Sequence, residues 1–153
     1  MTTRRQFLSA SAAFVPALLL ARHAAANAIA SVYSKNGIAI DGTDPVAYFT
    51  ESRAVAGDPG ITHEWSGVTW RFSSPRNREA FSADPEGFAP QFGGYCAWAV
   101  SRGYTAPTAP DAWTIFDGQL FLNYSKRIRR RWERDIPDNV ARGRANWPSV
   151  LDS

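Results

Sequence analysis

Residues 62–75 read THEWSGVTWRFSSP, and this stretch decides the class of fold. Two runs of β-branched and aromatic residues, Thr62–Trp65 and Val68–Phe72, flank Ser66-Gly67, a pattern that predicts a β-hairpin. Ser74-Pro75 follows at once, and this pair is typical of a helix start, since serine caps the helix and proline suits its first position. A hairpin that leads into a helix, with no βαβ rhythm around it, favours an α+β fold.

Both signals recur along the rest of the chain. Trp113–Phe116 and Leu120–Tyr124 flank Asp117-Gly118, with Gln119 beginning the second strand, which predicts another hairpin. Further short helices are expected after Asp44-Pro45 (through Phe49), after Asp84-Pro85 (to Phe88), within residues 93–100 (ended by Gly103), after Ser125 and from Pro137. Residues 29–36 are expected to form an extended arm. The sequence therefore predicts a small single α+β domain over residues 29–153, with two β-hairpins and several short helices.

The first 28 residues have the pattern of a cleavable signal segment. Arg4-Arg5 precede an apolar run that ends at Leu20, and small residues follow at A-x-A spacing up to Ala28, the expected cleavage site, with Ala26 as the alternative. The run is too short to span a bilayer of about 30 Å. Arg4-Arg5 resemble the twin-arginine motif, whose translocation machinery would be the partner during export; an ordinary secretory signal is the alternative. Either signal predicts a periplasmic or secreted protein.

Removing that segment changes the charge of the protein. The full chain has 17 basic and 14 acidic side chains, but three of the basic ones lie in residues 1–28, so the mature domain is formally neutral. We expect no nucleic-acid partner, because a basic cluster occurs only at Lys126–Arg134. That cluster could also contact anionic lipid or an acidic partner, or simply form the solvated face of a helix.

One set of motifs consists of Asp44-Pro45-Val46, Trp70–Ser74, Asn77, Phe81 and Asp84-Pro85. Together these resemble the YHS domain. A second set consists of Gly93–Val100, Trp113–Ile115, Leu122–Tyr124, Trp132-Glu133 and Asn146–Pro148, and it is similar to an exported bacterial subfamily of YHS-domain proteins, some of which carry selenocysteine. The resemblance covers roughly residues 31–150, nearly the whole mature chain. In metal-binding members, cysteines stand at positions that here hold Ala47, Ser73 and Asn77. These residues are poor or impossible ligands for soft metals, so the thiolate site of the family is absent.

Cys96 and His63 are the candidates for metal or redox chemistry. Cys96 is the single cysteine, so the chain forms no internal disulfide, and it is expected near a helix start, where the thiol pKa falls. Selenocysteine in some relatives, at the place that we take to match Cys96, would suit redox or soft-metal chemistry. His63 is the only histidine after cleavage and could complete a site if it faced Cys96. The alternatives are a buried, inert cysteine and a structural histidine.

Aromatic residues are the candidates for a ligand pocket. Seven of them could line such a pocket: Trp65, Trp70, Tyr95, Trp98, Tyr104, Trp113 and Tyr124. Tyr95, Trp98, Tyr104 and Trp113 are the preferred candidates. Dense aromatic content is equally expected from core packing, because each ring buries about 150–250 Å².

Three hypotheses of function remain open, and a non-enzymatic role is favoured because no hydrolase set, phosphate loop or His-rich motif occurs. The first is an exported YHS-like accessory or binding protein, in which copper or another soft metal would bind through Cys96. The second is a thiol-redox protein with Cys96 as its single reactive thiol. The third is a non-catalytic module that binds a small ligand or a protein.

Overall fold

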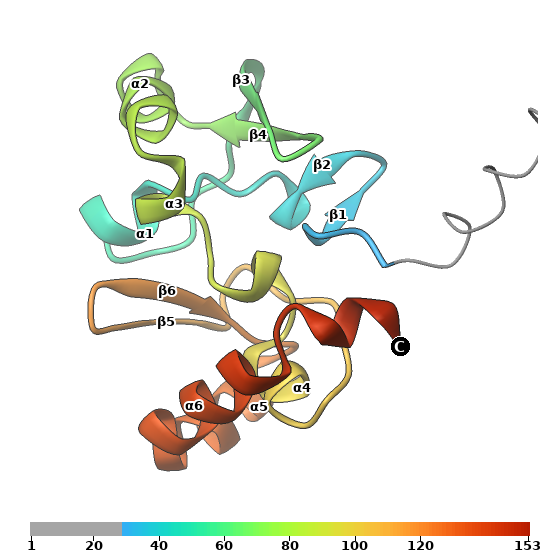
Figure 1. Cartoon of the computed structure of the whole chain (residues 1–153). Helices are drawn as coiled ribbons and strands as arrows, with labels where there is room; N and C mark the ends of the chain where they lie inside the picture. Colours follow the sequence, from blue (N-terminus) through green and yellow to red (C-terminus); the bar gives the residue numbers. More distant parts are fainter. Residues whose placement is uncertain (1–28) are drawn as a thin grey trace, which may run out of the picture.

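The computed structural model describes residues 29–153, so the predicted signal segment with Arg4 and Arg5 lies outside the described residues. The chain forms an α+β domain with two sheets (Figure 1). Its strands are β1 (Ser34–Lys35), β2 (Ile38–Ala39), β3 (Asp58–Trp65), β4 (Val68–Phe72), β5 (Trp113–Phe116) and β6 (Gln119–Leu122). Its helices are α1 (Ala47–Thr50), α2 (Pro75–Ala83), α3 (Pro85–Phe88), α4 (Ala97–Ser101), α5 (Lys126–Trp132) and α6 (Ile136–Asn146). Short 3-10 helices are η1 (Ile40–Gly42), η2 (Phe92–Gly94), η3 (Glu133–Asp135) and η4 (Ser149–Asp152).

Two halves of the chain lie at opposite ends of the molecule. The first half holds a four-stranded sheet in the order β1-β2-β4-β3, with helices α1, α2 and α3 beside it. The second half holds the β5–β6 hairpin and helices α4, α5 and α6 (Figure 1). The described part of the chain contains no helix long and apolar enough to cross a membrane.

Both predicted hairpins are confirmed. In the first, Trp65 pairs with Val68 and His63 with Trp70, so the turn lies at Ser66-Gly67. In the second, Phe116 pairs with Gln119 around Asp117-Gly118. The second hairpin's last strand ends at Leu122, so the expected extension to Tyr124 is wrong. Asn123 leaves the ladder because its fully buried side chain turns to the backbone N–H of Trp98.

Three predicted helix starts are confirmed by their caps. Ser74 accepts a hydrogen bond from the N–H of Asn77, Ser125 accepts one from Ile128, and Asp84 caps α3 in the same way. Side-chain caps satisfy backbone donors that no helical carbonyl can reach, and they explain why these helices begin at sharp boundaries.

Two other predicted starts differ from the structure. The helix expected after Asp44-Pro45 begins at Ala47, with Val46 at its N-cap, because Asp44 accepts from the N–H groups of both residues. The last helix begins one residue before Pro137, at Ile136, because Asp135 is its cap.

The extended arm expected over residues 29–36 is wrong at its end, where Ser34 and Lys35 form β1 and pair with β2 across Asn36-Gly37 in a tight hairpin. Residues 29–33 form no helix or strand. Strand β2 then pairs in parallel with β4, which attaches this hairpin to the main sheet.

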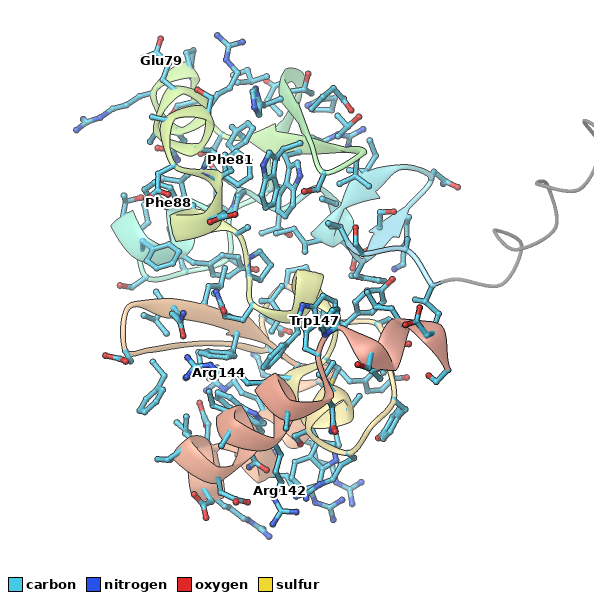
Figure 2. The ribbon with its side chains drawn as sticks, in the orientation of Figure 1. Glu79, Phe81, Phe88, Arg142, Arg144 and Trp147 are labelled. Carbon is cyan, nitrogen blue, oxygen red and sulfur yellow. The ribbon has the colours of Figure 1, made fainter. Side chains whose placement is uncertain are left out.

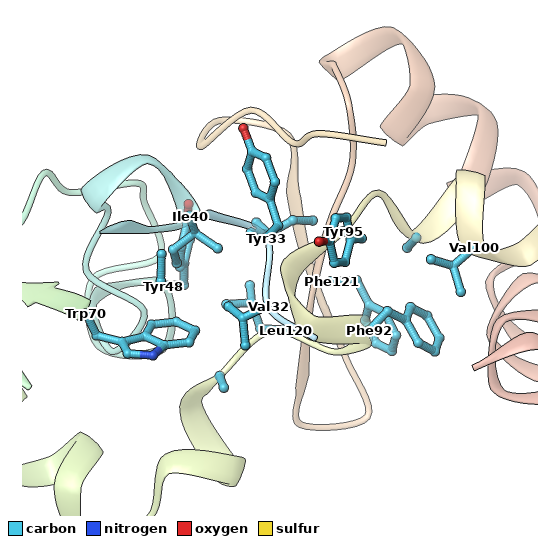
Figure 3. Packing of buried hydrophobic residues seen from close by; sticks show 14 of the residues in the cluster. Val32, Tyr33, Ile40, Tyr48, Trp70, Phe92, Tyr95, Val100, Leu120 and Phe121 are labelled. Carbon is cyan, nitrogen blue, oxygen red and sulfur yellow. The ribbon is translucent and has the colours of Figure 1, made fainter. Parts of the chain in front are cut away.

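One hydrophobic core joins the two halves. Trp70 and Tyr48 extend into it from the first half, and Phe92, Leu120 and Phe121 from the second (Figure 3). A continuous core across both halves makes residues 29–153 one domain, as predicted.

Candidate functional site

Cys96 lies inside the protein, directly before α4. Its side chain is 1 % exposed. The backbone N–H of Tyr124 donates to Cys96 Sγ at 3.3 Å, and the thiol itself donates to Asn123 Oδ1 at 3.5 Å. Those partners directly follow β6, so the segment after the second hairpin covers the thiol.

Burial has the opposite effect on this thiol from the one expected of a helix start. Desolvation raises the pKa of Cys96, and it outweighs the backbone N–H groups of Ala99, Tyr124 and Trp98, which lower it. Helix α4 has only five residues, so its dipole is small. The expected low thiol pKa is therefore wrong, and the thiolate is disfavoured at neutral pH.

We expect Cys96 to react slowly with iodoacetamide in the native protein. Because the thiol is covered and its pKa is raised, alkylation at neutral pH should be on the order of 100-fold slower than in the same protein unfolded in urea. Mass spectrometry of timed samples measures both rates. A native rate equal to or above the unfolded rate would show an activated, accessible thiol.

His63 does not meet Cys96. It lies on β3, where its ring packs edge-on against Phe81 with centroids 6.1 Å apart. Strand β3 and helix α4 lie at opposite ends of the molecule (Figure 1). Among residues 29–153, no three His, Cys, Asp or Glu side chains gather as a metal-holding group. This position agrees with the alternative expectation for His63, which was a structural histidine.

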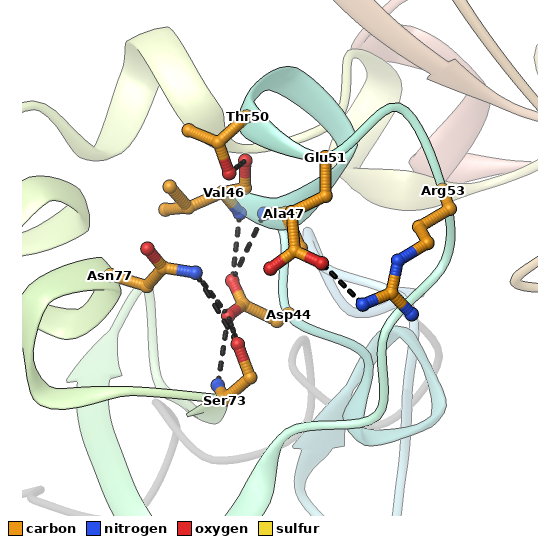
Figure 4. Close-up of polar contacts among 8 residues, drawn as sticks. All are labelled: Asp44, Val46, Ala47, Thr50, Glu51, Arg53, Ser73 and Asn77. Carbon is orange, nitrogen blue, oxygen red and sulfur yellow. Dashed lines mark hydrogen bonds and ion pairs between the residues drawn. The ribbon is translucent and has the colours of Figure 1, made fainter.

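The buried carboxylate of Asp44 contacts Ala47, Ser73 and Asn77, the three positions that the predicted resemblance to metal-binding YHS domains singled out. Asp44 has no exposed surface. Its Oδ1 accepts from the backbone N–H groups of Val46 (2.9 Å) and Ala47 (3.3 Å). Its Oδ2 accepts from the N–H and hydroxyl of Ser73 at 2.8 and 2.7 Å, and from Asn77 Nδ2 at 2.7 Å (Figure 4). The carboxylate therefore accepts five hydrogen bonds. Because the donors come from the start of α1, the end of β4 and α2, the cluster holds these elements together and has a structural role.

The four preferred aromatic pocket candidates lie apart from one another. Tyr95 is buried and donates its hydroxyl to the carbonyl of Ala30. Trp113 packs against Tyr48, with ring centroids 5.5 Å apart. Trp98 is half-buried under Arg102, and Tyr104 is 50 % exposed. These side chains pack inside the domain or lie on its surface. Other residues line the cleft described next.

A cleft lies between the two halves. Of the tryptophans that line it, the sequence pointed to Trp65 and Trp70 as pocket residues but not to Trp147. We call this site the tryptophan cleft; both of its parts are lined by Trp65, Ala89, Pro90 and Trp147. One part, of about 200 Å³, extends to Ser31, Val32 and Gly93. The other, of about 420 Å³, extends to Glu86, Gln91, Phe92 and Gln119. These volumes suit a small organic molecule or one ring of a larger one.

Aromatic neighbours fix both walls of the tryptophan cleft. Trp65 packs against Trp70 and Phe81, with centroids 5.8 Å apart in each pair. Trp147 follows α6, lies at the middle of the molecule (Figure 2) and packs against Phe92 and Tyr95. Since each indole is held by two other rings, the walls are preorganised.

The backbone beside this cleft is strained. Phe92, which lines the larger part, has a φ of 57°, in the left-handed region that a bulky residue rarely adopts. Gly93 and Gly94 continue that conformation with φ of 61° and 81°. For a bulky residue such as Phe92 this strain costs about 1–3 kcal/mol, and it clusters at ligand clamps and active sites. Together with the indole walls, it makes the tryptophan cleft a candidate site.

Comparison with known proteins does not assign this chain to a family. No family model matches the chain, and neither the curated proteins nor the solved structures contain a match. The resemblance to the YHS domain therefore stays a prediction that depends on the residues that carry it.

Proposed function

We propose that the mature domain is a non-catalytic binding module that works outside the cytoplasm and holds a ring-shaped small ligand in the tryptophan cleft. The observation that carries this proposal is the pair of indoles, Trp65 and Trp147, which face one hollow from different halves of the chain. Export rests on the signal pattern of residues 1–28.

The chemistry of the cleft favours a flat or cyclic ligand with polar groups on its rim. Indole walls offer large rigid surfaces on which rings stack. Glu86, Gln91 and Gln119 border the larger part, and their side chains can hydrogen-bond to hydroxyl or amide groups. A few polar groups at the edge of an aromatic hollow are typical of small-molecule sites.

The other two hypotheses find less support. A metal or redox role needs Cys96 to reach a ligand or substrate, and this thiol is buried with a raised pKa. It has no histidine partner, since His63 packs on Phe81.

Ligand-observed NMR with aromatic acids, heteroaromatic amides and methyl pyranosides tests the proposal. We expect at least one class to bind, and expect Trp147→Leu to weaken that binding about tenfold, roughly 1.4 kcal/mol, through lost stacking. Gln91→Ala should weaken it less, because it removes one rim contact. Trp98→Leu is the matched control, because this tryptophan lies outside the cleft and should leave affinity unchanged.

Two results would count against a binding cleft. One is that the probes bind equally to the Trp147→Leu and Trp98→Leu variants. The other is that no probe binds while copper(I) binds tightly to the wild type and not to Cys96→Ala, which would return the first hypothesis.

A further inference from the structure

Helix α5 and the η3 turn after it carry a stripe of exposed arginines that have no acidic partner among residues 29–153. Its members are Arg127, Arg130 and Arg131 on α5 and Arg134 in η3. They follow the spacing i, i+3, i+4 and i+7, which places the three members on α5 on one helical face. Other cations nearby are paired: Lys126 with Asp111, Arg129 with Glu133 and Arg142 with Asp138. We call these four residues the arginine stripe.

The arginine stripe has opposing effects on its own helix. Like charges three and four residues apart repel each other on a helix surface. Arg127 lies in the first turn, where the partial positive charge of the helix end disfavours a cation, whereas Arg130 and Arg131 lie in the last turn, where a cation is favoured. None of the four forms an ion pair within residues 29–153, so their guanidinium groups are available to an external anion.

Aromatic side chains adjoin the arginine stripe. Trp98 on α4 lies beneath two guanidinium groups, with Arg102 Cζ 4.1 Å and Arg131 Cζ 5.5 Å from the ring centroid. Tyr104 and Tyr124 are the large hydrophobic residues exposed in the described chain, at 50 % and 57 %. Tyr104 follows Arg102 closely, and Tyr124 directly precedes the cap of α5.

Charge divides along the same line as the two halves. Residues 29–91 hold five basic and eight acidic side chains, and residues 92–153, which include all of α4, hold nine basic and six acidic. The neutral domain is thus a dipole of about three charges at each end. Its basic end is built by α5 and α6, with Arg142 visible there (Figure 2). Such a dipole turns its basic end toward a negative surface.

We propose that the arginine stripe docks the domain on the surface of a bilayer that contains anionic phospholipid. Guanidinium groups bind phosphates with paired hydrogen bonds, and each arginine near such a surface adds to the attraction. Tyrosine and tryptophan favour the headgroup region, because their rings are apolar with one polar edge. An exposed helix face with aromatic neighbours suits a flat surface of lipid headgroups. A single acidic peptide would instead be bound in a groove.

Vesicle co-sedimentation of the full chain tests this docking. The probes are vesicles of phosphatidylcholine with phosphatidylglycerol, and of phosphatidylcholine alone. Arg127→Gln/Arg130→Gln should weaken binding to the anionic vesicles roughly 30-fold, from the contribution of each arginine. Removing like charges from α5 relieves repulsion, so the variant should fold at least as well as the wild type. Binding should fall as salt shortens the Debye length from about 30 Å at 0.01 M to about 3 Å at 1 M.

A matched variant and a local measurement keep the result specific. Arg76→Gln/Arg78→Gln removes the same charge from α2 and should leave binding nearly unchanged. Hydrogen exchange should slow in α5 when anionic vesicles are added, whatever residues 1–28 contribute. Equal losses in both double variants, or unchanged exchange in α5, would overturn the proposal. Protection of α5 by soluble polyglutamate but not by vesicles would overturn it in favour of an acidic protein partner.

Discussion

Replacing Asp44 with alanine is expected to destabilise the folded protein by about 5 kcal/mol. The side chain is fully buried and accepts five hydrogen bonds, from Val46, Ala47, Ser73 (two) and Asn77. Hydrogen bonds to charged groups contribute about 1.5–3 kcal/mol each, and buried donors left without partners cost about 1–3 kcal/mol. Unfolding in guanidinium chloride, followed by tryptophan fluorescence, measures the loss of free energy.

Asp84→Ala is the control for this substitution. Asp84 is exposed and accepts one cap hydrogen bond, from Gly87, so its loss should cost only about 1 kcal/mol. Asp44→Asn should also destabilise, because its NH₂ group would face donors wherever it points. A loss below about 2 kcal/mol for Asp44→Ala would contradict the structural role of the buried carboxylate.

Local signals in the sequence predicted most of the fold. Asp117-Gly118 and Ser66-Gly67 predicted their hairpins because such turns need residues that tolerate positive φ, and Asp117 has a φ of 51°. Ser74 and Ser125 predicted helix starts because a cap acts on donors only two or three residues away. Asn36-Gly37 carries the same turn signal, and it could have predicted the β1–β2 hairpin that was expected to be an extended arm.

The candidate site depended on contacts that no local pattern encodes. Cys96 is covered by Asn123 and Tyr124, which follow β6 and are far from it in the sequence. The tryptophan cleft needs Trp65 and Trp147 to meet across two halves of the chain. The spacing of each tryptophan in the sequence is also that of a core residue. Only the packing of the two halves therefore shows that both indoles stay partly exposed.

Three positions that the resemblance pointed to meet at one carboxylate. Ala47, Ser73 and Asn77 come from α1, the residue after β4 and α2, and all three donate to Asp44. The network of serine, asparagine and carboxylate is complete in itself, as a buried polar group requires. Hydrogen bonds therefore hold these three segments together, and the resemblance to the YHS domain itself stays a prediction.

Gly93→Ala is expected to destabilise the protein by at least about 3 kcal/mol and to deform the tryptophan cleft. A Cβ at this position would lie 2.0 Å from the carbonyl oxygen of Ser31 and 3.2 Å from the ring of Trp147. The backbone N–H of Tyr33 also donates to the Gly93 carbonyl, at 2.9 Å. The N-terminal segment must therefore move away, which breaks that contact and shifts one wall of the cleft. Guanidinium unfolding measures the stability, and the NMR probes of the cleft measure the affinity that remains.

Gly103→Ala separates the cost of the left-handed backbone from the cost of the steric overlap with another chain segment. Gly103 has a φ of +86°, so alanine there is strained as it is at Gly93, but nothing lies within 4 Å of the added Cβ. This variant should lose only about 1 kcal/mol, the cost of the left-handed backbone, and should bind the probes as the wild type does. Equal losses in the two glycine variants would mean that the close approach of Ser31 contributes nothing. A larger loss at Gly93, accompanied by weaker probe binding, ties the N-terminal segment to the shape of the cleft, because only there does the added methyl meet another chain segment.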